Sequence, residues 1–505
     1  MKELKKILIL CLLVSLVFVG CNDLFGDAPA VEDTKLLVSS DNQLNEVSEA
    51  LEANEPIDYE KVEVTTEINI PDRISIENIN MEKYRLSKEF VSAARAKVTE
   101  KLPNNSVTIL LSDYVIDDMK YLYTPNRNFY YLTGIDRENF ILMIIKSDDE
   151  VEEYLFANEV PAVDKWTGKM LTTDLAKTYS NIEEVKVLDT FDTVLNRQIT
   201  NKNIENVYVD LGNYEIDDIL IKSEDSNSKL TRSELFALKL SNEHPNIRIR
   251  NVAYDINELR TIKMPEEIEF IQNAIALTGE GINAIMEYAE PDMMEYQLES
   301  YFNFRLDSLG VKEYAFPTIA ASGQNATILH YIDNDQKSLD GDLVLFDLGA
   351  SFGYYSADIS RTIPVNGVFS DRQEELYNIV LKSQLATIEA VKPGVTMKEL
   401  SKISRDVMAN ELMSIGVIKN YDGVYEVYPH GISHSLGLDT HDPLSYSEPL
   451  RPGMIITVEP GLYLDDEGIG IRIEDDILVI EGGYLNLSEG IIKTVEDIEA
   501  YMNRN

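Results

Sequence analysis

Cysteine is nearly absent from this chain of 505 residues, because only Cys11 and Cys21 occur in it. Both lie close to the N-terminus, and Cys11 falls within an apolar run at 7–20. The body of the chain therefore has no disulfide and no thiol chemistry. We expect its stability to come from the packing of its core.

Long apolar runs are also scarce. The run at 7–20 has 14 residues, whereas a helix that spans a bilayer needs about 20. It follows three lysines, which is typical of a secretory signal, and we predict a signal peptide at 1–20.

The predicted signal peptide ends in Phe-Val-Gly-Cys, which resembles a bacterial lipobox with Cys21 as the lipid-bearing residue. The alternative is an ordinary signal peptide followed by a chance cysteine. A lipid on Cys21 would place the protein at the extracytoplasmic face of a bacterial membrane, in the periplasm or at the cell surface.

Basic residues are few: 45 Lys and Arg stand against 88 Asp and Glu, which gives a net charge of −43. This balance argues against nucleic acid and anionic bilayer surfaces as partners. Segment 22–63 holds 12 acidic and 2 basic residues, and such a stretch repels itself and extends. We therefore predict a lipid-anchored acidic linker at 21–69. The overall charge fits either life in high salt or a soluble surface outside the cell.

The remaining chain is long enough for two domains. Residues 70–253 alternate apolar runs such as VTILL (107–111) with amphipathic stretches, which predicts an α/β layer structure. A second domain is predicted at 254–505. It opens with a long amphipathic helix that has Pro265 near its N-terminus, where a missing N–H costs nothing.

The second domain carries a faint internal repeat. Residues 285–299 align with 387–401, and the spacing between matched positions grows from 102 to 116 residues along the chain. The matched pairs are Pro291 with Pro393, Asp347 with Glu459, and Asp358 with Glu474. Each half then runs helix, helix, strands and contributes two carboxylates, which a pseudo-twofold axis would bring together.

Two of these acids end apolar runs, LVLFD (343–347) and IITVE (455–459). A buried carboxylate without a partner costs several kcal/mol, and metal ions would provide the partner. An oxygen-rich set with one imidazole suits divalent ions such as manganese. Two ions about 3.5–4 Å apart can share a bridging hydroxide that drives hydrolysis. The predicted ligands are Asp347, Asp358, His434, Glu459 and Glu474.

Histidine is distributed just as unevenly. Of the five histidines, His330, His430, His434 and His441 lie in or near the acidic segments, and only His244 lies elsewhere. A lone histidine is more often structural than catalytic, but four that gather with four buried acids favour an active site. Neighbouring glycines are unfavourable for a helix at 430–434, so we predict a strand or loop there.

Together these motifs resemble those of the metallopeptidase family of aminopeptidase P, prolidase and methionine aminopeptidase. The resemblance covers roughly 70–500. Its catalytic motifs, in family order, are SGQNATILHY (322–331), DLGASFGYYSADISRT (347–362), HGISHSLGLDTHD (430–442), TVEPGLY (457–463) and GIRIEDD (470–476). Residues 128–135 and 146–171 resemble the N-terminal domain of aminopeptidase P. The implied fold is an α/β two-domain protein, with an N-terminal α/β domain before a pita-bread (pseudo-twofold α+β) catalytic domain.

The resemblance implies a role for each metal ligand. Asp347 would chelate one ion and His434 the other. Asp358 and Glu474 would touch both ions. Glu459 would complete the second site and act as proton shuttle.

The resemblance also implies substrate contacts. His330 and His441 would hydrogen-bond the substrate and stabilise charge at the scissile carbonyl. The proline-side pocket would be lined by His430, Tyr463 and Arg472.

Two positions in the first domain bear on the active site. Trp166, the only tryptophan, lies where the first domain of the family approaches an active site, which can be that of a neighbouring subunit, and we expect a homo-oligomer. Asn128 stands where aminopeptidase P often has Asp, which pairs with the arginine equivalent to Arg472. Asn cannot form that ion pair.

The predicted function is therefore an Xaa-Pro aminopeptidase, in which a metal-bridging hydroxide attacks the carbonyl before a proline in second position. A prolidase that cuts only dipeptides is the close alternative, and the first domain favours the aminopeptidase. A non-hydrolytic peptide-binding relative would have lost metal ligands, and none of the five is lost. A salt-adapted structural lipoprotein would have no reason to gather four histidines.

Overall fold

The computed structural model describes residues 76, 79–81, 84–112, 125–148, 150–166, 168–225, 228–311 and 313–503. The predicted signal peptide, Cys21 and the predicted linker lie outside the described residues. The described residues all belong to one compact unit. Within the described ranges, no helix is long and apolar enough to cross a membrane.

A six-stranded sheet forms the centre of the N-terminal domain, in the order β6-β3-β2-β1-β7-β8. Its strands are β1 (Ser106–Leu111), β2 (Ile141–Ser147), β3 (Glu150–Ala157), β6 (Val185–Val187), β7 (Asn206–Val209) and β8 (Arg248–Asn251). Strand β1 pairs antiparallel with β2 and parallel with β7, and every one of its residues is buried. This central place explains why four of its six residues, Val107 and Ile109 to Leu111, are apolar.

Helices pack around this sheet and complete the predicted α/β structure. A core cluster joins Ile109 and Val207 of the sheet to Leu195 and Ala237 of the helices. The helices are α3 (Lys88–Lys101), α4 (Arg127–Thr133), α5 (Thr173–Ser180), α6 (Phe191–Asn201), α7 (Ile216–Glu224) and α8 (Arg232–Glu243). A short hairpin, β4 (Val163–Asp164) with β5 (Gly168–Lys169), precedes α5.

The first half of the catalytic domain consists of long helices followed by antiparallel strands. Helix α10 begins at Pro265, as the sequence predicts. The helices are α9 (Ala253–Thr261), α10 (Pro265–Tyr288) and α11 (Glu295–Ser308). The sheet has the order β13-β10-β9, with β9 (Ile319–Ser322), β10 (Leu343–Leu348) and β13 (Ile359–Pro364). The 3-10 helix η4 (Gly323–Thr327) and the hairpin β11 (Ser351–Phe352) with β12 (Tyr355–Ser356) lie between these strands in the sequence.

The second half repeats this order. Its helices are α12 (Asp371–Glu389), α13 (Met397–Ser414), α14 (Val424–Val427) and, at the end of the chain, α15 (Val495–Met502). Its sheet has the order β14-β17-β18, with β14 (Ile455–Val458), β17 (Asp475–Ile480) and β18 (Gly483–Asn486). A hairpin joins β15 (Gly461–Leu464) to β16 (Ile469–Arg472).

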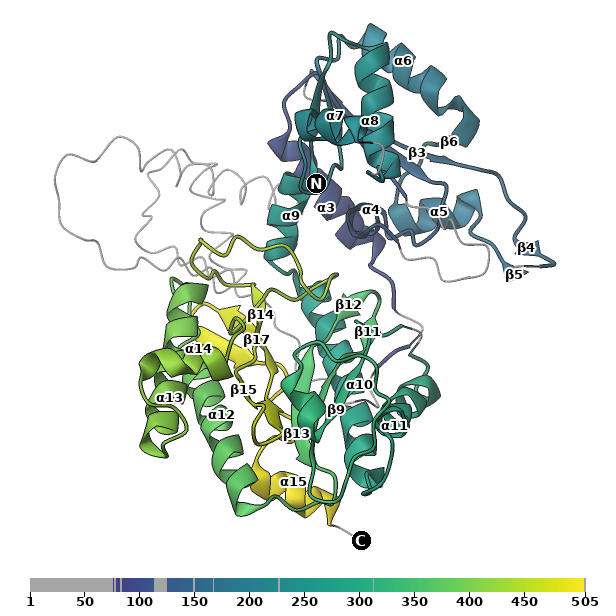
Figure 1. The fold of residues 1–505 in the computed structure, drawn as a ribbon. Coiled ribbons are helices and arrows are strands. Elements are labelled where there is room, and N and C mark those ends of the chain that lie inside the picture. Colours follow the sequence, from purple (N-terminus) through teal and green to yellow (C-terminus); the bar gives the residue numbers. More distant parts are fainter. Residues whose placement is uncertain are drawn as a thin grey trace, which may run out of the picture. The chain divides into compact units, whose positions relative to one another are not determined.

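The predicted internal repeat is therefore visible in the fold. Strand β10 pairs antiparallel with β13, as β14 does with β17. Figure 1 shows α10 and α11 on one side of the catalytic strands and α12 and α13 on the other. The boundary predicted at 253/254 falls at the start of α9. The exact domain limits stay predictions.

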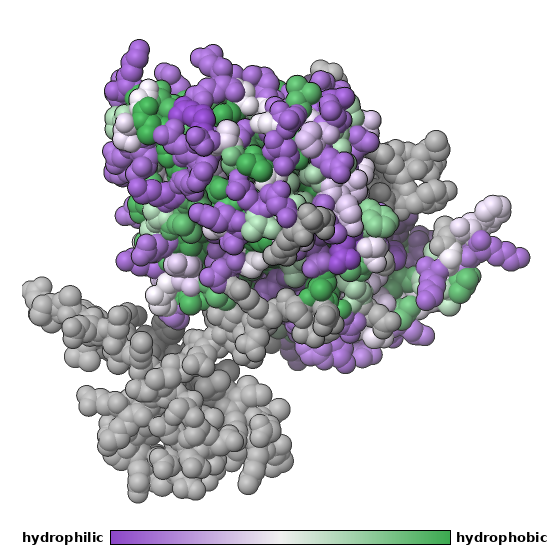
Figure 2. Space-filling view, turned by 90° about the horizontal axis from the view of Figure 1, so that it is seen from below, coloured by the Kyte–Doolittle hydropathy of each residue, from purple (hydrophilic) through white to green (hydrophobic). Residues whose placement is uncertain are grey.

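One face of the molecule is mostly hydrophilic (Figure 2). On the face shown in Figure 2, hydrophilic residues predominate and hydrophobic residues are scattered between them. Such scattering is ordinary for a protein surface and marks no interaction site by itself.

Candidate metal centre and active site

Four carboxylates come together because two antiparallel strand pairs place them at corresponding positions. Asp347 lies in β10, and Asp358 directly precedes its partner strand β13. Glu459 directly follows β14, and Glu474 directly precedes its partner strand β17. The two half-repeats therefore supply the acids as matched pairs.

His434 joins the two pairs of acids. Ligand atoms of Asp358, His434 and Glu474 all lie within 4.8 Å of one another. His434 Nε2 is 3.3 Å from Asp358 Oδ2 and 3.8 Å from Glu459 Oε1. His434 Nδ1 lies 3.1 Å from Ser435 O, which can only accept, so Nδ1 carries the proton. Nε2 therefore faces the carboxylates, and in the neutral ring its lone pair can bind a metal ion.

Burial makes these acids hard to ionise in the absence of cations. Loss of solvation raises the pKa of Asp358 and of Glu474 well above their ordinary values. Neighbouring carboxylates, among them Asp347 and Glu459, raise both further. Burial also raises the pKa of Glu459 to about 7, although His434 acts in the opposite direction. Positive ions would relieve this cost.

Asp347 shows the same need for a cation. Its Oδ1 is buried and has no hydrogen-bond partner among the described residues, whereas Oδ2 lies 2.6 Å from Arg472 Nη2. An unpartnered buried acceptor calls for an explanation, and a metal ligand provides one. Carboxylates with one imidazole also match the donors that hard and borderline divalent ions prefer. The residues present therefore fit the predicted metal site.

Hydrogen bonds connect this acidic cluster to the predicted proline-side pocket. Arg472 donates from Nη2 to Asp347 and from Nη1 to the Tyr463 hydroxyl, at 3.0 Å. It also donates from Nε to Ser360 Oγ at 2.8 Å, and Ser360 donates to Glu474 Oε2 at 2.8 Å. Burial tends to lower the pKa of Arg472, but Tyr463, Asp347 and Glu474 outweigh burial and raise it well above its ordinary value. Arg472 is a permanent positive charge.

His430 continues this chain of hydrogen bonds. Its Nδ1 lies 2.7 Å from Gly431 O, and its Nε2 lies 2.9 Å from the Tyr463 hydroxyl. Because the carbonyl only accepts, Nδ1 carries the proton and the Tyr463 hydroxyl donates to Nε2. Burial, followed by the charge of Arg472, lowers the pKa of His430 to about 3. The imidazole is therefore neutral at neutral pH.

The other two predicted histidines lie close to the same cluster. The ring of His441 packs against His434 with centroids 4.3 Å apart. Burial lowers the pKa of His441, and the charges of His434 and His330 lower it further. His330 is exposed, in the loop after η4, and its charge also lowers the pKa of His430. His330 therefore lies within electrostatic reach of both histidines.

The histidine segment has the predicted local structure. Residues 429–442 form a loop with one isolated bridge, between Ser435 and Ile456. The His434 N–H donates to Thr457 Oγ1 at 3.1 Å, and its carbonyl accepts from the Thr457 N–H at 3.0 Å. These bonds fix the loop to the strand that precedes Glu459.

Some residues that hold the site are not among those predicted from sequence. Ser360 links Arg472 to Glu474, and its place two residues after Asp358 in a strand was a usable signal, since alternate residues share a face. Asp476 is fully buried and accepts from the Asp358 N–H at 3.2 Å.

Glu295, at the start of α11, forms hydrogen bonds that hold the loop that carries His330. Its buried carboxylate accepts from the backbone N–H groups of Ser322 and Gln336, at 2.7 and 2.8 Å. It also accepts from Asn325 Nδ2 at 3.0 Å and the Tyr331 hydroxyl at 2.8 Å. This acid was not singled out in the sequence.

Two positions of the first domain were singled out in the sequence, Trp166 and Asn128. Trp166 lies in the turn of the β4–β5 hairpin and is 94% exposed, so this chain covers almost none of it. The expected neighbour of Asn128 is wrong for this chain. Its Oδ1 accepts from Arg260 Nη1 at 2.8 Å, and its Nδ2 donates to Asp210 Oδ2 at 3.1 Å. Arg472 instead belongs to β16 and pairs with Asp347.

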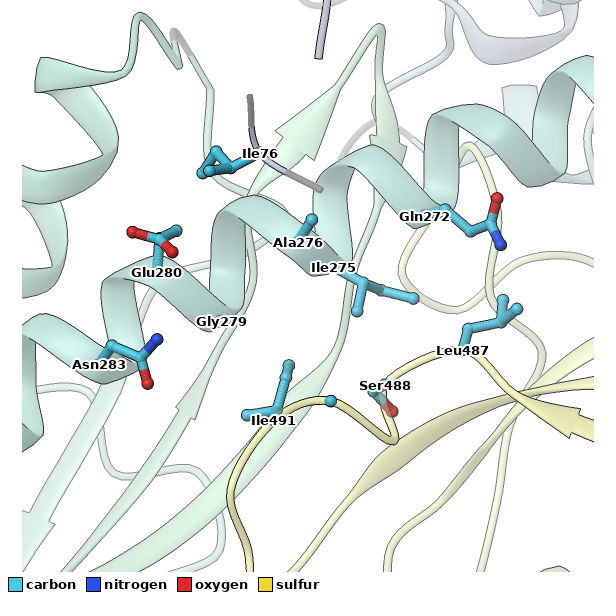
Figure 3. Close-up of a pocket in the computed structure, with 11 residues that line it drawn as sticks. Ile76, Gln272, Ile275, Ala276, Gly279, Glu280, Asn283, Leu487, Ser488 and Ile491 are labelled. Carbon is cyan, nitrogen blue, oxygen red and sulfur yellow. The ribbon is translucent and has the colours of Figure 1, made fainter. Parts of the chain in front are cut away.

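A separate cavity of about 340 Å³ lies between α10 and the loop at 487–491 (Figure 3). Its lining residues are Ile76, Gln272, Ile275, Ala276, Gly279, Glu280, Asn283, Leu487, Ser488, Gly490 and Ile491. None of them is a predicted site residue, so this cavity is not part of the cluster above.

Comparisons with known proteins identify the family. Residues 269–481 match metallopeptidase family M24, and residues 92–208 match the N-terminal domain of aminopeptidase P. The Xaa-Pro aminopeptidase of Escherichia coli (strain K12) is 33% identical over 82% of this chain and 97% of its own length.

Solved structures agree with this family. A Bacillus anthracis protein assigned as an aminopeptidase P matches with a TM-score of 0.79 and 44% identity, over 83% of this chain and 99% of its own. Zinc-substituted E. coli aminopeptidase P in complex with product matches with a TM-score of 0.73 and 31% identity, over 83% and 98%.

The chain belongs to metallopeptidase family M24. It is a hydrolase, a metallo-aminopeptidase. The pita-bread catalytic domain predicted from the sequence is confirmed, together with the N-terminal domain of aminopeptidase P.

Proposed function

We propose that the enzyme removes the first residue of peptides whose second residue is proline, which is the Xaa-Pro aminopeptidase reaction. One observation supports this above the others. Arg472 contacts both Asp347 of the acidic cluster and Tyr463 of the predicted proline-side pocket. The acidic cluster and the residues that recognise proline are therefore close enough to engage the same Xaa-Pro bond. Relatives named Xaa-Pro aminopeptidase and aminopeptidase P match 82% and 83% of this chain, at 33% and 31% identity.

The metal centre would hold two divalent ions. We assign Asp347 to one ion, His434 and Glu459 to the other, and Asp358 and Glu474 to both. Manganese is the ion we propose, because four carboxylates make the site rich in oxygen. When bound, the ions acidify the attacking water and polarise the scissile carbonyl.

Glu459 is the residue that we assign to proton transfer. Without metal, burial raises the pKa of this carboxyl to about 7, so its surroundings favour uptake of a proton. Bound cations favour its ionised form, which accepts a proton from the attacking water. The same proton then passes to the proline nitrogen as the peptide bond breaks.

His441 and His330 are assigned to the scissile carbonyl. Negative charge develops on its oxygen during attack, and preorganised N–H donors stabilise that charge. The lowered pKa of His441 keeps its imidazole neutral near pH 7, so it donates without carrying a charge that would repel the metal ions.

His430, Tyr463 and Arg472 are assigned to the proline side. The nitrogen of an Xaa-Pro bond carries no hydrogen, so a site for it must recognise the ring instead of an N–H group. Tyr463 and His430 offer two aromatic rings with centroids 5.6 Å apart in an edge-to-face arrangement. Arg472 donates a hydrogen bond to the Tyr463 hydroxyl and so fixes one ring of this pair.

A prolidase is the second candidate, because it would use the same metal ligands. The deciding measurement is kcat/KM for an Xaa-Pro dipeptide against Xaa-Pro-Xaa with the same first residue. We expect the tripeptide to be cut at least as well. A tenfold preference for the dipeptide, about 1.4 kcal/mol of transition-state binding, would make the enzyme a prolidase. Binding of both peptides without hydrolysis by the metal-loaded protein would instead favour a non-hydrolytic relative.

Attachment to a membrane is a separate proposal that depends on the sequence alone. A lipid on Cys21 would anchor the enzyme at the extracytoplasmic face, and the acidic linker would hold it off the bilayer. Cys21→Ser should release the protein from membranes. Partition of the variant into detergent would show another anchor and reject the lipobox.

The exposure of Trp166 supports a further proposal, that a homo-oligomer places this indole at the active site of a neighbouring subunit. Trp166→Ala should then raise KM for tripeptides in the oligomer. A monomer with full activity would contradict both the assembly and the contact.

A further inference from the structure

The loop that carries His434 and His441 is closed at its base by Asp442. The Asp442 N–H donates to Ser435 O at 3.0 Å, so the residues after the two histidines are joined. The histidine rings at the two ends of the loop then meet with centroids 4.3 Å apart. The place of His441 therefore depends on where Asp442 is held.

The Asp442 side chain lies inside the loop and is 1% exposed. Its Oδ1 accepts from the Asp439 N–H at 3.2 Å. A Cβ on Gly437 would lie 2.5 Å from Asp442 Oδ2, so a larger residue there would displace the carboxylate. The loop is thus wrapped around one buried charge.

Two cations from outside the loop hold that charge. Arg260 Nη2 lies 2.6 Å from Asp442 Oδ1, and Lys263 Nζ lies 3.0 Å from Oδ2. Both are buried, at 3% and 2% exposure, and neither touches the predicted metal ligands. Burial tends to raise the pKa of Asp442, but Arg260 and Lys263 outweigh it and leave the pKa lowered. Asp442 is therefore ionised at neutral pH.

The same guanidinium extends into the first domain. Arg260 Nη1 donates to Asn128 Oδ1 in α4 at 2.8 Å, while Nη2 also contacts Asp439 at 2.6 Å. The planar guanidinium of Arg260 thus donates from two nitrogens to three acceptors. A lysine ammonium cannot reproduce this geometry. Asn128 is held in turn by Asp210 of the first domain.

We propose that Arg260 is a positioning residue for His441. Together with Lys263 it holds Asp442, which fixes the imidazole of the preceding residue at the reacting carbonyl, and Asn128 ties this support to the first domain. The inference rests on the role proposed for His441. The rival explanation is an ion pair that contributes only to the stability of the fold.

The first test does not need activity. Histidine labelled with ¹³C at Cε1 would be followed by NMR in the full-length protein, with and without zinc, and the five signals assigned by His→Gln substitution. Arg260→Lys should shift the His441 signal and leave that of His244 in place. An unchanged His441 signal would overturn the proposal, even if no peptide substrate were found.

Kinetics provide the second test. Arg260→Lys should lower kcat for an Xaa-Pro-Xaa peptide by about 10- to 100-fold, the scale expected for a displaced catalytic group, with KM and zinc content little changed. In a His441→Gln background it should have no further effect. If Arg260→Lys lowers kcat by the same factor in the wild type and in His441→Gln, the proposal is overturned, because Arg260 would then not act through His441.

A matched control separates positioning from stability. Arg95 is 1% exposed and pairs with Glu153 in the first domain, away from the histidine loop. Arg95→Lys should lower the melting temperature without changing kcat at a temperature where the protein is folded. If Arg260→Lys behaves in the same way, the ion pair is only structural.

Discussion

Arg472 and Asp347 form an ion pair with 2.6 Å between Nη2 and Oδ2, in which a predicted substrate contact holds a predicted metal ligand. Their side chains are 5% and 15% exposed. Removing one partner of a buried pair leaves an uncompensated charge, at a cost of about 3–5 kcal/mol. A change of charge in the acidic cluster should therefore also affect the proline-side pocket, and the reverse.

Arg472→Met should destabilise the metal-free protein by about 3 kcal/mol or more, because Asp347 loses its positive neighbour. Manganese should restore part of this stability by neutralising the same carboxylate. Thermal unfolding of variant and wild type, each with and without manganese, measures both effects. Arg95→Met is the matched control, since manganese should not restore the stability lost there. Equal stability of Arg472→Met and wild type without metal would contradict this account.

Glu474→Ala should abolish turnover and reduce metal content, because this carboxylate is assigned to both ions. Chelation of the wild type should likewise abolish activity, and manganese should restore it. The measurement is metal per chain by atomic absorption, alongside peptidase activity. Glu481→Ala, an exposed acid next to β17, should change neither. Full activity of metal-free wild type would reject the hydrolytic mechanism.

Tyr463→Phe should lower kcat/KM for Xaa-Pro-Xaa by about tenfold, because the change removes one hydroxyl that bonds both Arg472 and His430. Activity on Xaa-Ala-Xaa, expected to be low in the wild type, should fall less, so that the preference for proline narrows. The measurement is the ratio of kcat/KM for Xaa-Pro-Xaa to kcat/KM for Xaa-Ala-Xaa, with the same first and third residues in both peptides. A preference that stays unchanged would place proline recognition elsewhere.

Glu267 predicts a pH dependence of stability that is independent of the metal ligands. Its carboxylate is 1% exposed and accepts from the Met264 N–H at 2.8 Å and the Tyr355 hydroxyl at 3.0 Å. Burial raises its pKa to about 7 from 4.5. The folded protein thus holds this proton more tightly than the unfolded chain, so the contribution to stability is full below pH 4.5 and is lost as pH rises to about 7.

Glu267→Gln keeps the shape of the side chain and cannot ionise. It should therefore reduce the loss of stability between pH 5 and pH 7.5 by up to about 3 kcal/mol. Urea unfolding of the manganese-loaded protein at a series of pH values measures the slope of the free energy of unfolding against pH. Glu269→Gln, half-buried on the same helix, is the control and should leave the slope as in the wild type. An identical slope in Glu267→Gln and wild type would mean that Glu267 does not titrate in this range.

Much of the site could be predicted because its signals are local. An acid at the end of an apolar run, such as Asp347 or Glu459, identifies a strand end with a buried charge. Glycines beside His434 exclude a helix there, and the structure has a loop. Pro265 was predicted near the start of a long helix, and α10 begins there. Each of these inferences needed only the properties of a few neighbouring residues.

Contacts between distant segments could not be predicted in the same way. Asn128 was expected opposite Arg472 and lies against Arg260, 132 residues along the chain. Glu295 was not singled out in the sequence, yet its carboxylate organises the His330 loop through four hydrogen bonds. Neither partner can be derived from spacing, because both depend on how whole elements pack.

The sequence by itself indicated a carboxylate-rich metal centre, the order of the elements and the halves of the repeat, since residue type and periodicity fix which groups can ionise, ligate or be buried. Only the tertiary structure decided which charges face each other. Arg472 reaches Asp347 across 125 residues of sequence because β16 and β10 lie side by side. Arg260 reaches Asp442 across 182 because α9 lies beneath the histidine loop. Such pairings are set by long-range packing, in which many weak contacts act together. They therefore cannot be predicted from a short motif.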